Sequence, residues 1–323
     1  MNKNSRSEKI VQAAELFYEQ RVSQIEIAKI LDCSRSTVSR LLSEAIETGI
    51  VKIIIKRPVK KIPYLAERIK DYFKLREVIV VSGGSNKEQA YPNVGYATAE
   101  LLSKIIHPGS IIGISWGVTL SYVVKELDEF TYDAKGIEVV QLMGGLGSRD
   151  PAIDGPELAR KMAECLGGTY RTIQSPAVLE TLESAQHILK EAKIKEVMDR
   201  AKLAEIIITS VGSLKDNLSS IERSGFIKEE EMAYYLSKGA IGHSLARLID
   251  ENGIQIDHPY NQRVIAVSFD VLQKAKWSIG ISASPLKASI IIGAIKNKLF
   301  NTLVIDDGTA KEIIRITSGM TMM

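Results

Sequence analysis

The chain has 323 residues, of which 45% are hydrophobic and 25% are charged, and its formal net charge is +3. This length indicates two domains, one of them large enough for a sizeable core. The apolar runs are too short for a membrane span and the polar first residues are not a signal peptide, so we expect a cytoplasmic protein with no membrane partner. Cys33 and Cys165 lie far apart without metal-ligand spacing, which favours a reducing compartment and no metal site.

The positive charge is concentrated at the N-terminal end of the chain. Residues 1–61 hold 12 Lys and Arg against 7 Asp and Glu, a surplus of +5, whereas the remainder holds 30 against 32, a deficit of 2. The composition therefore indicates that the N-terminal segment is the part that meets nucleic acid.

Residues 8–20 form the first expected helix, and its apolar positions recur at helical spacing: Ile10, Val11, Ala14, Phe17 and Tyr18. The following window, residues 24–43, has the sequence QIEIAKILDCSRSTVSRLLS and the pattern of a helix-turn-helix. Its apolar residues stand where two short helices must pack: Ile27, Ala28, Leu31, Val38 and Leu41. Asp32 occupies a turn position often filled by Gly, and Asp tolerates left-handed geometry. We expect a three-helix DNA-binding core.

The second helix of this window presents a polar, basic face that can enter a major groove. Ser34 is a good N-cap, and no acidic residue follows it until Glu44. An ordinary amphipathic helix pair would show a similar apolar stripe, but its outer face would mix Glu with Lys. The predicted DNA-contacting residues are Ser34, Arg35, Ser36, Thr37, Ser39, Arg40 and Ser43.

Gly49 ends the expected recognition helix, and residues 50–56 are prone to form a strand. This run is either a small wing, with Lys52 on the DNA backbone, or a plain connecting strand. The prolines and basic residues of 57–63 cannot continue either element, so we place a linker at 58–63. The predicted domains are a helix-turn-helix unit, winged or not, at 1–57 and an effector-binding and oligomerisation domain at 64–323.

Beyond the linker, strand-like and helix-like segments alternate, which predicts an α/β domain with a parallel or mixed sheet covered on both faces. The expected strands are 78–81, 111–115, 137–142, 170–173, 206–211, 264–268, 277–282 and 303–306. The expected helices are 117–127, 156–166, 229–236, 240–249, 286–296 and 309–315, with a further helix around 64–73.

Three strand-to-helix junctions have the character of ligand sites, because ligands of open α/β sheets gather at the carboxyl ends of strands, near helix N-termini. At 113–119 the strand ends at Ser115, and the helix opens with Gly117 and Thr119; a capped helix with an aromatic lid explains this junction equally well. The glycine-rich loop at Gly144 and Gly145 is a weak signal, because flexibility alone would explain it. The named residues of both junctions are candidates for binding an effector.

The third junction, 282–287, places Lys287 in the first turn of a helix, where a cation opposes the helix dipole. An anionic ligand would remove this conflict. A lysine that simply extends into solvent is the alternative.

The ordered motifs of the chain resemble the SorC family of bacterial transcriptional regulators, including its deoxyribonucleoside and central-glycolytic-gene branches. The matching segments, which cover nearly the whole chain, are SQIEIAKILDCSRSTVSRLL, IIGISWGVTL, IEVVQLMGG, AEIIITSVGSL, KGAIGHSLARLIDENG and SPLKASIIIGAIKNKLFNTLVIDDGTA. The resemblance implies an effector domain similar to phosphosugar isomerases, a phosphorylated sugar or related metabolite as effector, and a tetramer that represses or activates a sugar-use operon. It also implies that the Gly117–Thr119 loop and Lys287 hold the anion and that the Gly144–Gly145 loop borders the sugar.

Two positions depart from the family pattern. His243 stands where relatives often carry an acidic residue that binds sugar hydroxyls; its imidazole either contacts the ligand or is an ordinary surface side chain. Met143 stands where the deoxyribose-phosphate branch places a lysine, so no Schiff base can form there.

The alternative function is a phosphosugar isomerase or aldolase fused to a DNA-binding head, which would need a general base or an amine near the sugar. The candidates are His243, Asp270, Asp306 and Asp307, but they form no recognisable acid–base pair, and Asp307 has a simpler role as a helix N-cap. A constitutive DNA-binding or architectural protein would leave the α/β domain without a purpose. We therefore expect a regulator that is not an enzyme and needs no cofactor, with operator DNA and a sugar phosphate as partners.

Overall fold

The computed structural model describes residues 3–51, 59–84, 87–132, 135–148, 150–214 and 219–320. The chain divides into two compact units, Met1–Pro58 and Val59–Met323. Part of the expected linker is bound to the second unit, because the Ile62 amide donates to the Val80 carbonyl (2.8 Å) and the Ser82 amide donates to the Lys60 carbonyl (2.8 Å). Within the described residues, no helix is both long and apolar enough to cross a membrane.

The small unit is a bundle of short helices: α1 (Lys3–Ala14), a π-helical turn η1 (Glu15–Glu19), α2 (Gln24–Ile30) and α3 (Arg35–Glu47). The Ser23 side chain caps α2 in a capping box with Glu26, and Ser34 caps α3 by accepting from the Thr37 amide. Asp32 has a φ of 46° and Gly49 a φ of 77°, as a tight turn and a helix end require. The helix-turn-helix expected at 24–43 is present.

The core of this unit contains all five apolar residues predicted for the helix-turn-helix, Ile27, Ala28, Leu31, Val38 and Leu41. The prediction for the first helix was partly wrong. Ile10 and Ala14 are buried, but Val11 is 39% and Tyr18 38% exposed. Ile10 and Ala14 face α3, and Val11, one position further on, turns away from it. A π-helical turn contains more residues than an α-helical turn, so it changes the direction in which the following side chains point. As a result, Phe17 rather than Tyr18 packs against the core.

The wing predicted at 50–56 lies mostly outside the described residues, as does Lys52. Ile50 and Val51, which are described, are not in a strand.

The large unit contains a sheet of seven parallel strands in the order β1-β10-β9-β5-β2-β3-β4. Its strands are β1 (Glu77–Val81), β2 (Ile111–Ile114), β3 (Glu138–Gln141), β4 (Thr169–Arg171), β5 (Ile206–Thr209), β9 (Trp277–Ser282) and β10 (Thr302–Asp306). A small antiparallel sheet, in the order β6-β7-β8, consists of β6 (Val211–Ser213), β7 (Gly242–Ser244) and β8 (Arg247–Ile249). The α/β fold class predicted from the sequence is confirmed.

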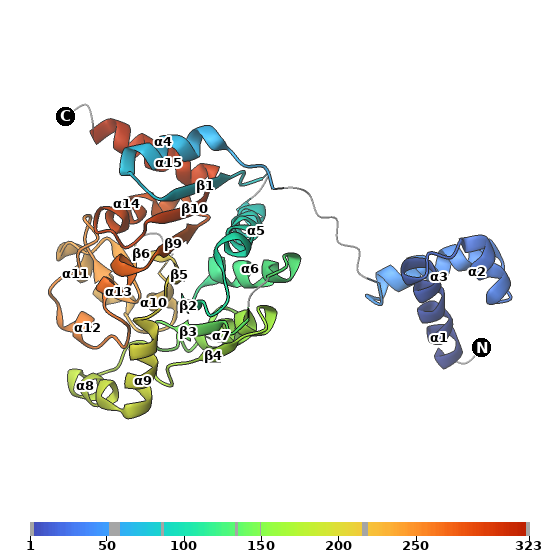
Figure 1. Cartoon of the computed structure of the whole chain (residues 1–323), viewed down its shortest axis with the longest axis horizontal. Helices are drawn as coiled ribbons and strands as arrows, with labels where there is room; N and C mark the ends of the chain where they lie inside the picture. The colour runs from blue at the N-terminus through green and yellow to red at the C-terminus, as the bar shows by residue number, and fades with distance from the viewer. Residues whose placement is uncertain are drawn as a thin grey trace. The chain divides into compact units, whose positions relative to one another are not determined.

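Helices cover both faces of the large sheet (Figure 1). One face packs against α5 (Lys87–Ile105), α6 (Val118–Glu126) and α7 (Gly155–Cys165). The other face packs against α4 (Pro63–Phe73), α9 (Ala192–Ala201), α14 (Ala288–Lys296) and α15 (Asp307–Met320). Shorter helices complete the unit: α8 (Leu182–Lys190), α10 (Ser220–Arg223), α11 (Glu229–Ser237), α12 (Pro259–Gln262), α13 (Phe269–Lys274) and the 3-10 turns η2 (Leu127–Glu129), η3 (Pro151–Ile153) and η4 (Pro285–Lys287). Because the helices cover the faces of the sheet, the carboxyl ends of its strands are bordered by loops.

Two predicted elements were wrong. The helix predicted at 240–249 is instead the β7–β8 hairpin, whose turn places Leu245 (φ 46°) and Ala246 (φ 60°) in the left-handed region without the usual Gly or Asn. The strand predicted at 264–268 is irregular chain, which pairs with neighbouring segments through isolated bridges and accepts hydrogen bonds from the Arg247 side chain. Its apolar residues are buried by the surrounding loops rather than by strand pairing. A short run of buried apolar residues has the composition of a strand, which explains the wrong prediction.

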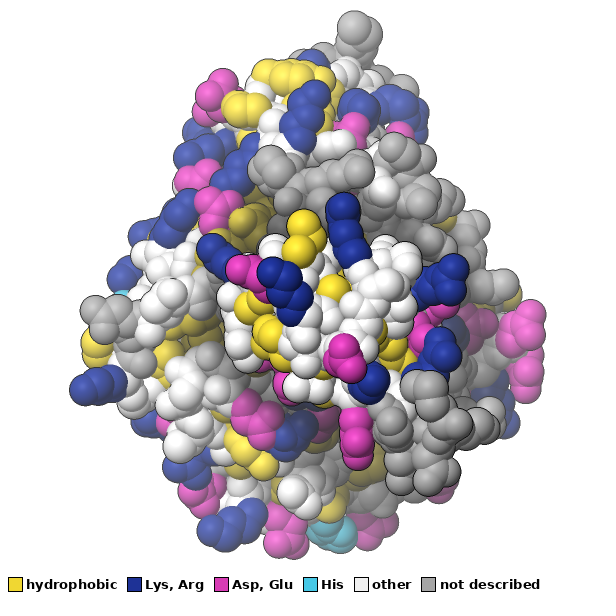
Figure 2. All heavy atoms as spheres, turned by 90° about the vertical axis from the view of Figure 1, so that its right-hand side faces the viewer, with side chains coloured by type: hydrophobic (Ala, Val, Ile, Leu, Met, Phe, Trp, Pro, Cys, Tyr) yellow, Lys and Arg dark blue, Asp and Glu magenta, His cyan; other side chains and the backbone are white. Residues whose placement is uncertain are grey.

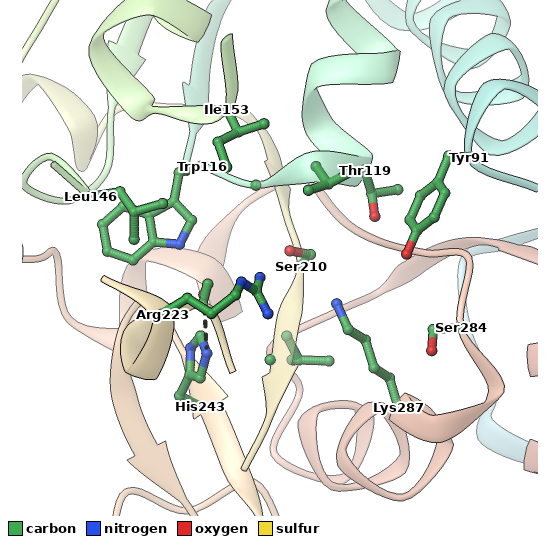
Figure 3. A pocket seen from close by; sticks show the side chains of 15 residues that line it. Tyr91, Trp116, Thr119, Leu146, Ile153, Ser210, Arg223, His243, Ser284 and Lys287 are labelled. Carbon is green, nitrogen blue, oxygen red and sulfur yellow. Dashed lines mark hydrogen bonds between the residues drawn. The ribbon is translucent and has the colours of Figure 1, made fainter. Parts of the chain in front are cut away.

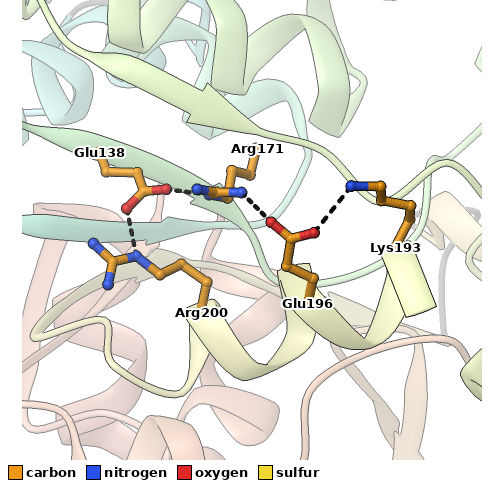
Figure 4. Close-up of polar contacts among 5 residues, drawn as sticks. All are labelled: Glu138, Arg171, Lys193, Glu196 and Arg200. Atoms are coloured by element: carbon orange, nitrogen blue, oxygen red, sulfur yellow. Dashed lines mark hydrogen bonds and ion pairs between the residues drawn. The ribbon is translucent and has the colours of Figure 1, made fainter.

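Glu138, at the start of β3, anchors an ion-pair network that joins β3, β4 and α9 (Figure 4). Its side chain is only 10% exposed and accepts hydrogen bonds from the guanidinium groups of Arg171 and Arg200. Arg171 continues the network to Glu196 (2.7 Å), which also pairs with Lys193 (3.3 Å). Burial raises the pKa of Glu138, but the two arginines lower it by more, so that its pKa lies below its ordinary value.

We expect Glu138→Gln to reduce the free energy of unfolding at pH 7 by about 1–3 kcal/mol, because it leaves two arginines without their carboxylate. This loss of stability is modest because both arginines are about 40% exposed, so that solvent partly screens their charges. A carboxyl with a lowered folded pKa stabilises fully above its unfolded pKa, about 4.5, and this contribution is lost as the pH falls through the folded pKa. Urea unfolding should therefore show the difference between the two proteins shrinking below about pH 4.5. Glu196→Gln, in the exposed outer pair, is the control and should cost under about 0.5 kcal/mol.

Candidate functional site

The predicted DNA-contacting face of α3 is accessible to a ligand. All seven described residues of this face are exposed: Ser34, Arg35, Ser36, Thr37, Ser39, Arg40 and Ser43. Three of the hydroxyls are engaged at the helix start, because Ser34 Oγ lies 2.7 Å from Ser36 Oγ and 2.9 Å from Thr37 Oγ1. Arg35 and Arg40 are thus the long side chains of this surface.

In the view of Figure 2, Lys and Arg side chains are interspersed with Asp and Glu side chains. Within the small unit, Glu44 is already paired with Arg6 (2.8 Å). The basic character predicted from the sequence is thus carried on α3 by Arg35 and Arg40, both of which are exposed.

A second candidate site lies at the point where the strand order reverses. From β2 the chain proceeds outward to β3 and β4, whereas from β5 it proceeds in the opposite direction to β9 and β10. The connections that leave the paired strands β2 and β5 therefore run in opposite directions, and such a switch point is where open α/β sheets bind ligands. The segments that follow these two strands, 116–119 and 210–212, line a cavity with about 150 Å³ of water-accessible space.

The cavity brings together four of the seven predicted effector residues, Gly117, Thr119, His243 and Lys287 (Figure 3). The other described lining residues are Tyr91, Trp116, Val118, Leu146, Ile153, Ser210, Val211, Gly212, Ser220, Arg223 and Ser284. No carboxylate occurs among these described residues.

The three remaining predicted residues lie behind the cavity wall rather than in it. Ser115 is buried, and its hydroxyl accepts a hydrogen bond from Thr209 (2.9 Å). The backbone amides of Gly144 and Gly145 donate to the carbonyls of Ile265 and Ser175, both at 2.8 Å. A Cβ at Gly144 would lie 2.4 Å from the Pro176 carbonyl oxygen. Gly144 thus serves close backbone packing, whereas a Cβ at Gly145 would lie no nearer than 3.6 Å to its neighbours. The residue that follows them, Leu146, lines the cavity.

The N-terminus of α6 opens into the cavity. Its N-cap residue, Gly117, has φ 126° and ψ 163°, a conformation that other residues rarely adopt, and it supplies no side chain to cap the helix. The first amides of a helix have no partner within the helix, and the helix dipole adds partial positive charge there. Thr119, in the first turn of α6, turns its hydroxyl toward the cavity in Figure 3. This end of α6 is therefore suited to an anion.

Two cations approach the same space from different elements. Lys287 ends η4 and is the N-cap residue of α14, while Arg223 ends the short helix α10; both side chains point into the cavity (Figure 3). Burial, and then the charge of Arg223, lowers the pKa of Lys287 to about 8. Lys287 is half-buried, so the alternative that it simply extends into solvent does not hold. Ser284 precedes η4 as expected for an N-cap, although its side chain makes no cap hydrogen bond.

His243, on β7, forms part of the cavity wall and is only 4% exposed, so it is not an ordinary surface residue. Its Nε2 lies 3.4 Å from the Ser220 hydroxyl. Burial, followed by the charges of Lys287 and Arg223, lowers the pKa of His243 to about 3. The imidazole is therefore neutral at physiological pH.

Sequence reasoning missed much of the cavity, including both Tyr91 and Arg223. Ser210 had a usable signal, because it lies near the carboxyl end of the strand expected at 206–211 and directly follows the observed β5. Arg223 had none, because it lies on a four-residue helix, and only the tertiary fold brings it to the switch point.

The acidic candidates for an enzyme do not line this cavity. Asp270 pairs with Lys274 (2.8 Å). Asp306, rather than Asp307 as predicted, accepts from the amides that begin α15, those of Gly308 and Thr309. Asp307 accepts from the Gly83 amide (2.8 Å) and pairs with Lys311. Among the residues that the structure describes, no group of three or more His, Cys, Asp or Glu side chains could hold a metal ion.

Comparison with known proteins gives matches along the whole chain. A family model described as "Putative sugar-binding domain" matches residues 57–315. The deoxyribonucleoside regulator of Bacillus subtilis is 30% identical over 305 residues, covering 94% of this chain and 96% of that protein. The sorbitol operon regulator of Klebsiella pneumoniae is 28% identical over 309 residues, covering 95% of this chain and 97% of that protein. The crystal structure of full-length SorC from Klebsiella pneumoniae superimposes with a TM-score of 0.72 at 27% identity, over 94% of this chain and 98% of that one.

Proposed function

The chain belongs to the family of SorC- and DeoR-type transcriptional regulators with a sugar-binding domain, and we propose that it reads operator DNA through α3 and senses a phosphorylated sugar in the switch-point cavity. It is a regulator and not an enzyme, because its full-length relatives are transcriptional regulators. The alternatives of a fused isomerase or aldolase and of an architectural protein are therefore set aside. Acting on DNA, it works in the cytoplasm, and the operon it controls serves sugar use.

One observation carries the phosphorylated effector: Lys287, Arg223 and the uncapped start of α6 converge on one cavity, and its described lining holds no carboxylate. A cavity for a neutral sugar would offer hydrogen-bond acceptors as well as donors and would carry no net positive charge. A phosphate satisfies both the cations and the helix end. Trp116, 5% exposed, and Leu146 provide an apolar wall against which the carbon skeleton of the ligand packs.

A thermal-shift panel of sugar phosphates, each beside its parent sugar, tests this function. A ligand that binds only the folded state stabilises it by RT ln(1 + [L]/Kd), about 2.7 kcal/mol at one hundred times Kd. We expect at least one phosphate to raise the melting temperature while its parent sugar does not. The same phosphate should change binding to operator DNA selected from random sequence. A panel in which the parent sugars act as well as their phosphates would contradict the proposal.

We also propose that the protein is a homo-oligomer, a tetramer by family resemblance. A single helix-turn-helix reads only one half-site, and specific affinity ordinarily comes from a symmetric pair. Light scattering at micromolar concentration, with and without operator, checks this, and a monomer under both conditions would contradict it.

A further inference from the structure

The chain that enters the large unit is fastened to the edge of the large sheet. Residues 59–62, which we call the strap, directly follow the boundary between the two units and lie antiparallel to the carboxyl end of the edge strand β1. The Ile62 amide donates to the Val80 carbonyl and the Ser82 amide donates to the Lys60 carbonyl, both at 2.8 Å. Because so short a pairing opens at a small cost in free energy, changes at Ser82 alter how firmly the strap is held.

Ser82 is in turn held by α5. The Asn93 side chain donates from Nδ2 to the Ser82 carbonyl (2.8 Å), so the residue that fastens the strap through its amide is fixed to α5 through its carbonyl. Lys61 of the strap also pairs with Glu100, further along α5 (2.7 Å), but this partly exposed ion pair contributes little. Asn93 therefore ties the first turns of α5 to the strap through Ser82.

The same end of α5 borders the switch-point cavity. Tyr91, two residues before Asn93, lines the cavity and turns its hydroxyl toward it (Figure 3). Its ring stacks on that of Tyr122 in α6, with 5.8 Å between the centroids and 17° between the planes. Gly95 allows the two helices to approach closely, because a Cβ there would lie 2.7 Å from the Tyr122 carbonyl oxygen. The start of α5 is thus packed against the helix whose N-terminus opens into the cavity.

Pro92 makes this end of α5 dependent on its tertiary contacts. It lies inside the helix and has no amide to donate to the carbonyl four residues earlier. The turn that carries Tyr91 is therefore held less by the helix itself than an ordinary turn is. A ligand that packs against Tyr91 and the start of α6 adds contacts to this turn, and it thereby holds the neighbouring Asn93 in place.

Building on the proposed function, we propose that Asn93 couples the cavity to the strap: a ligand bound against Tyr91 steadies the start of α5, and Asn93 then holds Ser82 and the strap more firmly. Asn93 is a positioning residue, because it acts through Ser82 and is not among the described residues that line the cavity. The strap, either closed on β1 or open, is the two-state element that the ligand biases. By linkage, closing the strap also strengthens ligand binding.

The holding of the strap is tested first on the full-length protein without a ligand. Trypsin cleavage after Lys60 and Lys61, identified by mass spectrometry, and hydrogen exchange of the Ile62 and Ser82 amides both report opening of the strap. We expect Asn93→Ala to raise both rates about fivefold, the effect of one lost hydrogen bond. Asn93→Asp keeps the size of the side chain but cannot donate to a carbonyl, so it should raise them as much.

The matched control is Asn297→Ala. Asn297 is half-buried like Asn93 and also donates its side-chain amide to a loop carbonyl, that of Gly253 (2.7 Å), but it lies at the C-terminal end of α14. We expect this variant to lower the free energy of unfolding by a similar amount and to leave the opening of the strap unchanged. Equal cleavage and exchange rates in the wild type and Asn93→Ala would overturn the role of Asn93.

The coupling is tested with inorganic phosphate and with each sugar phosphate that stabilises the wild type. In the wild type, a saturating compound should slow exchange of the Ile62 and Ser82 amides and change operator affinity. In Asn93→Asp, its calorimetric affinity should fall no more than about fivefold, and its effect on operator affinity should shrink about fivefold. Asn297→Ala should respond as the wild type does.

The outcomes distinguish this inference from the proposed function. If a sugar phosphate stabilises the wild type and changes operator affinity equally in Asn93→Asp, the coupling through Asn93 is wrong and the proposed function stands. If neither inorganic phosphate nor any sugar phosphate stabilises the wild type, the proposed function fails and the coupling fails with it.

Discussion

Replacing Arg35 and Arg40 with alanine is expected to remove specific operator binding without unfolding the protein. Both side chains are exposed on α3, and neither contributes to the core of the small unit. An arginine that contacts a guanine edge or a phosphate in the groove contributes about 1–3 kcal/mol, so the double variant should lose on the order of 2–6 kcal/mol. Fluorescence anisotropy with a labelled operator, at one fixed salt concentration, measures this loss.

The control for this experiment is Arg315→Ala, which removes an equally long cation from an exposed position on α15. Its described ion pair is with Glu312 in the preceding turn of the same helix (2.7 Å). We expect it to leave operator affinity unchanged, because its charge belongs to the other unit. Unchanged operator affinity in a well-folded Arg35→Ala/Arg40→Ala protein would show that α3 does not read DNA.

The small unit was predictable from the sequence because its signals are local. Ser23 and Ser34 cap helices that begin at the next residue, Asp32 takes the left-handed turn, and the apolar residues meet within a window of twenty positions. The one error concerns the first helix, where Val11 and Tyr18 are exposed instead of buried. Val11 lies one position beyond the buried face of α1, and Tyr18 lies in the π-helical turn η1, which changes the helical period. A pattern that assumes 3.6 residues per turn cannot register that change.

The strands of the large sheet were also largely predictable, because strands buried on both faces are continuous apolar runs. The hairpin at 242–249 was not, because its turn at Leu245 and Ala246 lacks turn residues and its buried face is imposed from outside. A Cβ at Gly242 would lie 1.8 Å from Cδ1 of Ile290, so this glycine is required by packing against α14 rather than by its own conformation. Local sequence carries no trace of such a constraint.

The cavity was predictable only where its residues follow strands or begin helices. Gly117, Thr119 and Lys287 stand at such junctions, and all three line it. Tyr91 lies in the second turn of α5 and Arg223 ends α10. Only the crossing of the chain between the two halves of the sheet brings them together. A switch point is a property of strand order, which no single segment encodes.

Lys287→Ala is expected to abolish the response to a phosphorylated sugar while Thr119→Ala only weakens it. The lysine supplies a charged hydrogen bond in a partly desolvated cavity, and its loss should cost on the order of 2–3 kcal/mol, or at least tenfold in affinity. Thr119 offers one neutral hydroxyl, whose loss should cost about 1 kcal/mol. Lys296→Ala removes the exposed lysine at the opposite end of α14 and should leave effector affinity unchanged. The measurement is calorimetric titration of each variant with whichever sugar phosphate stabilises the wild type. The rank order is part of the prediction, because an anion held only by the start of α6 would make the two losses of affinity similar. Wild-type affinity in Lys287→Ala would place the anion site elsewhere in the molecule.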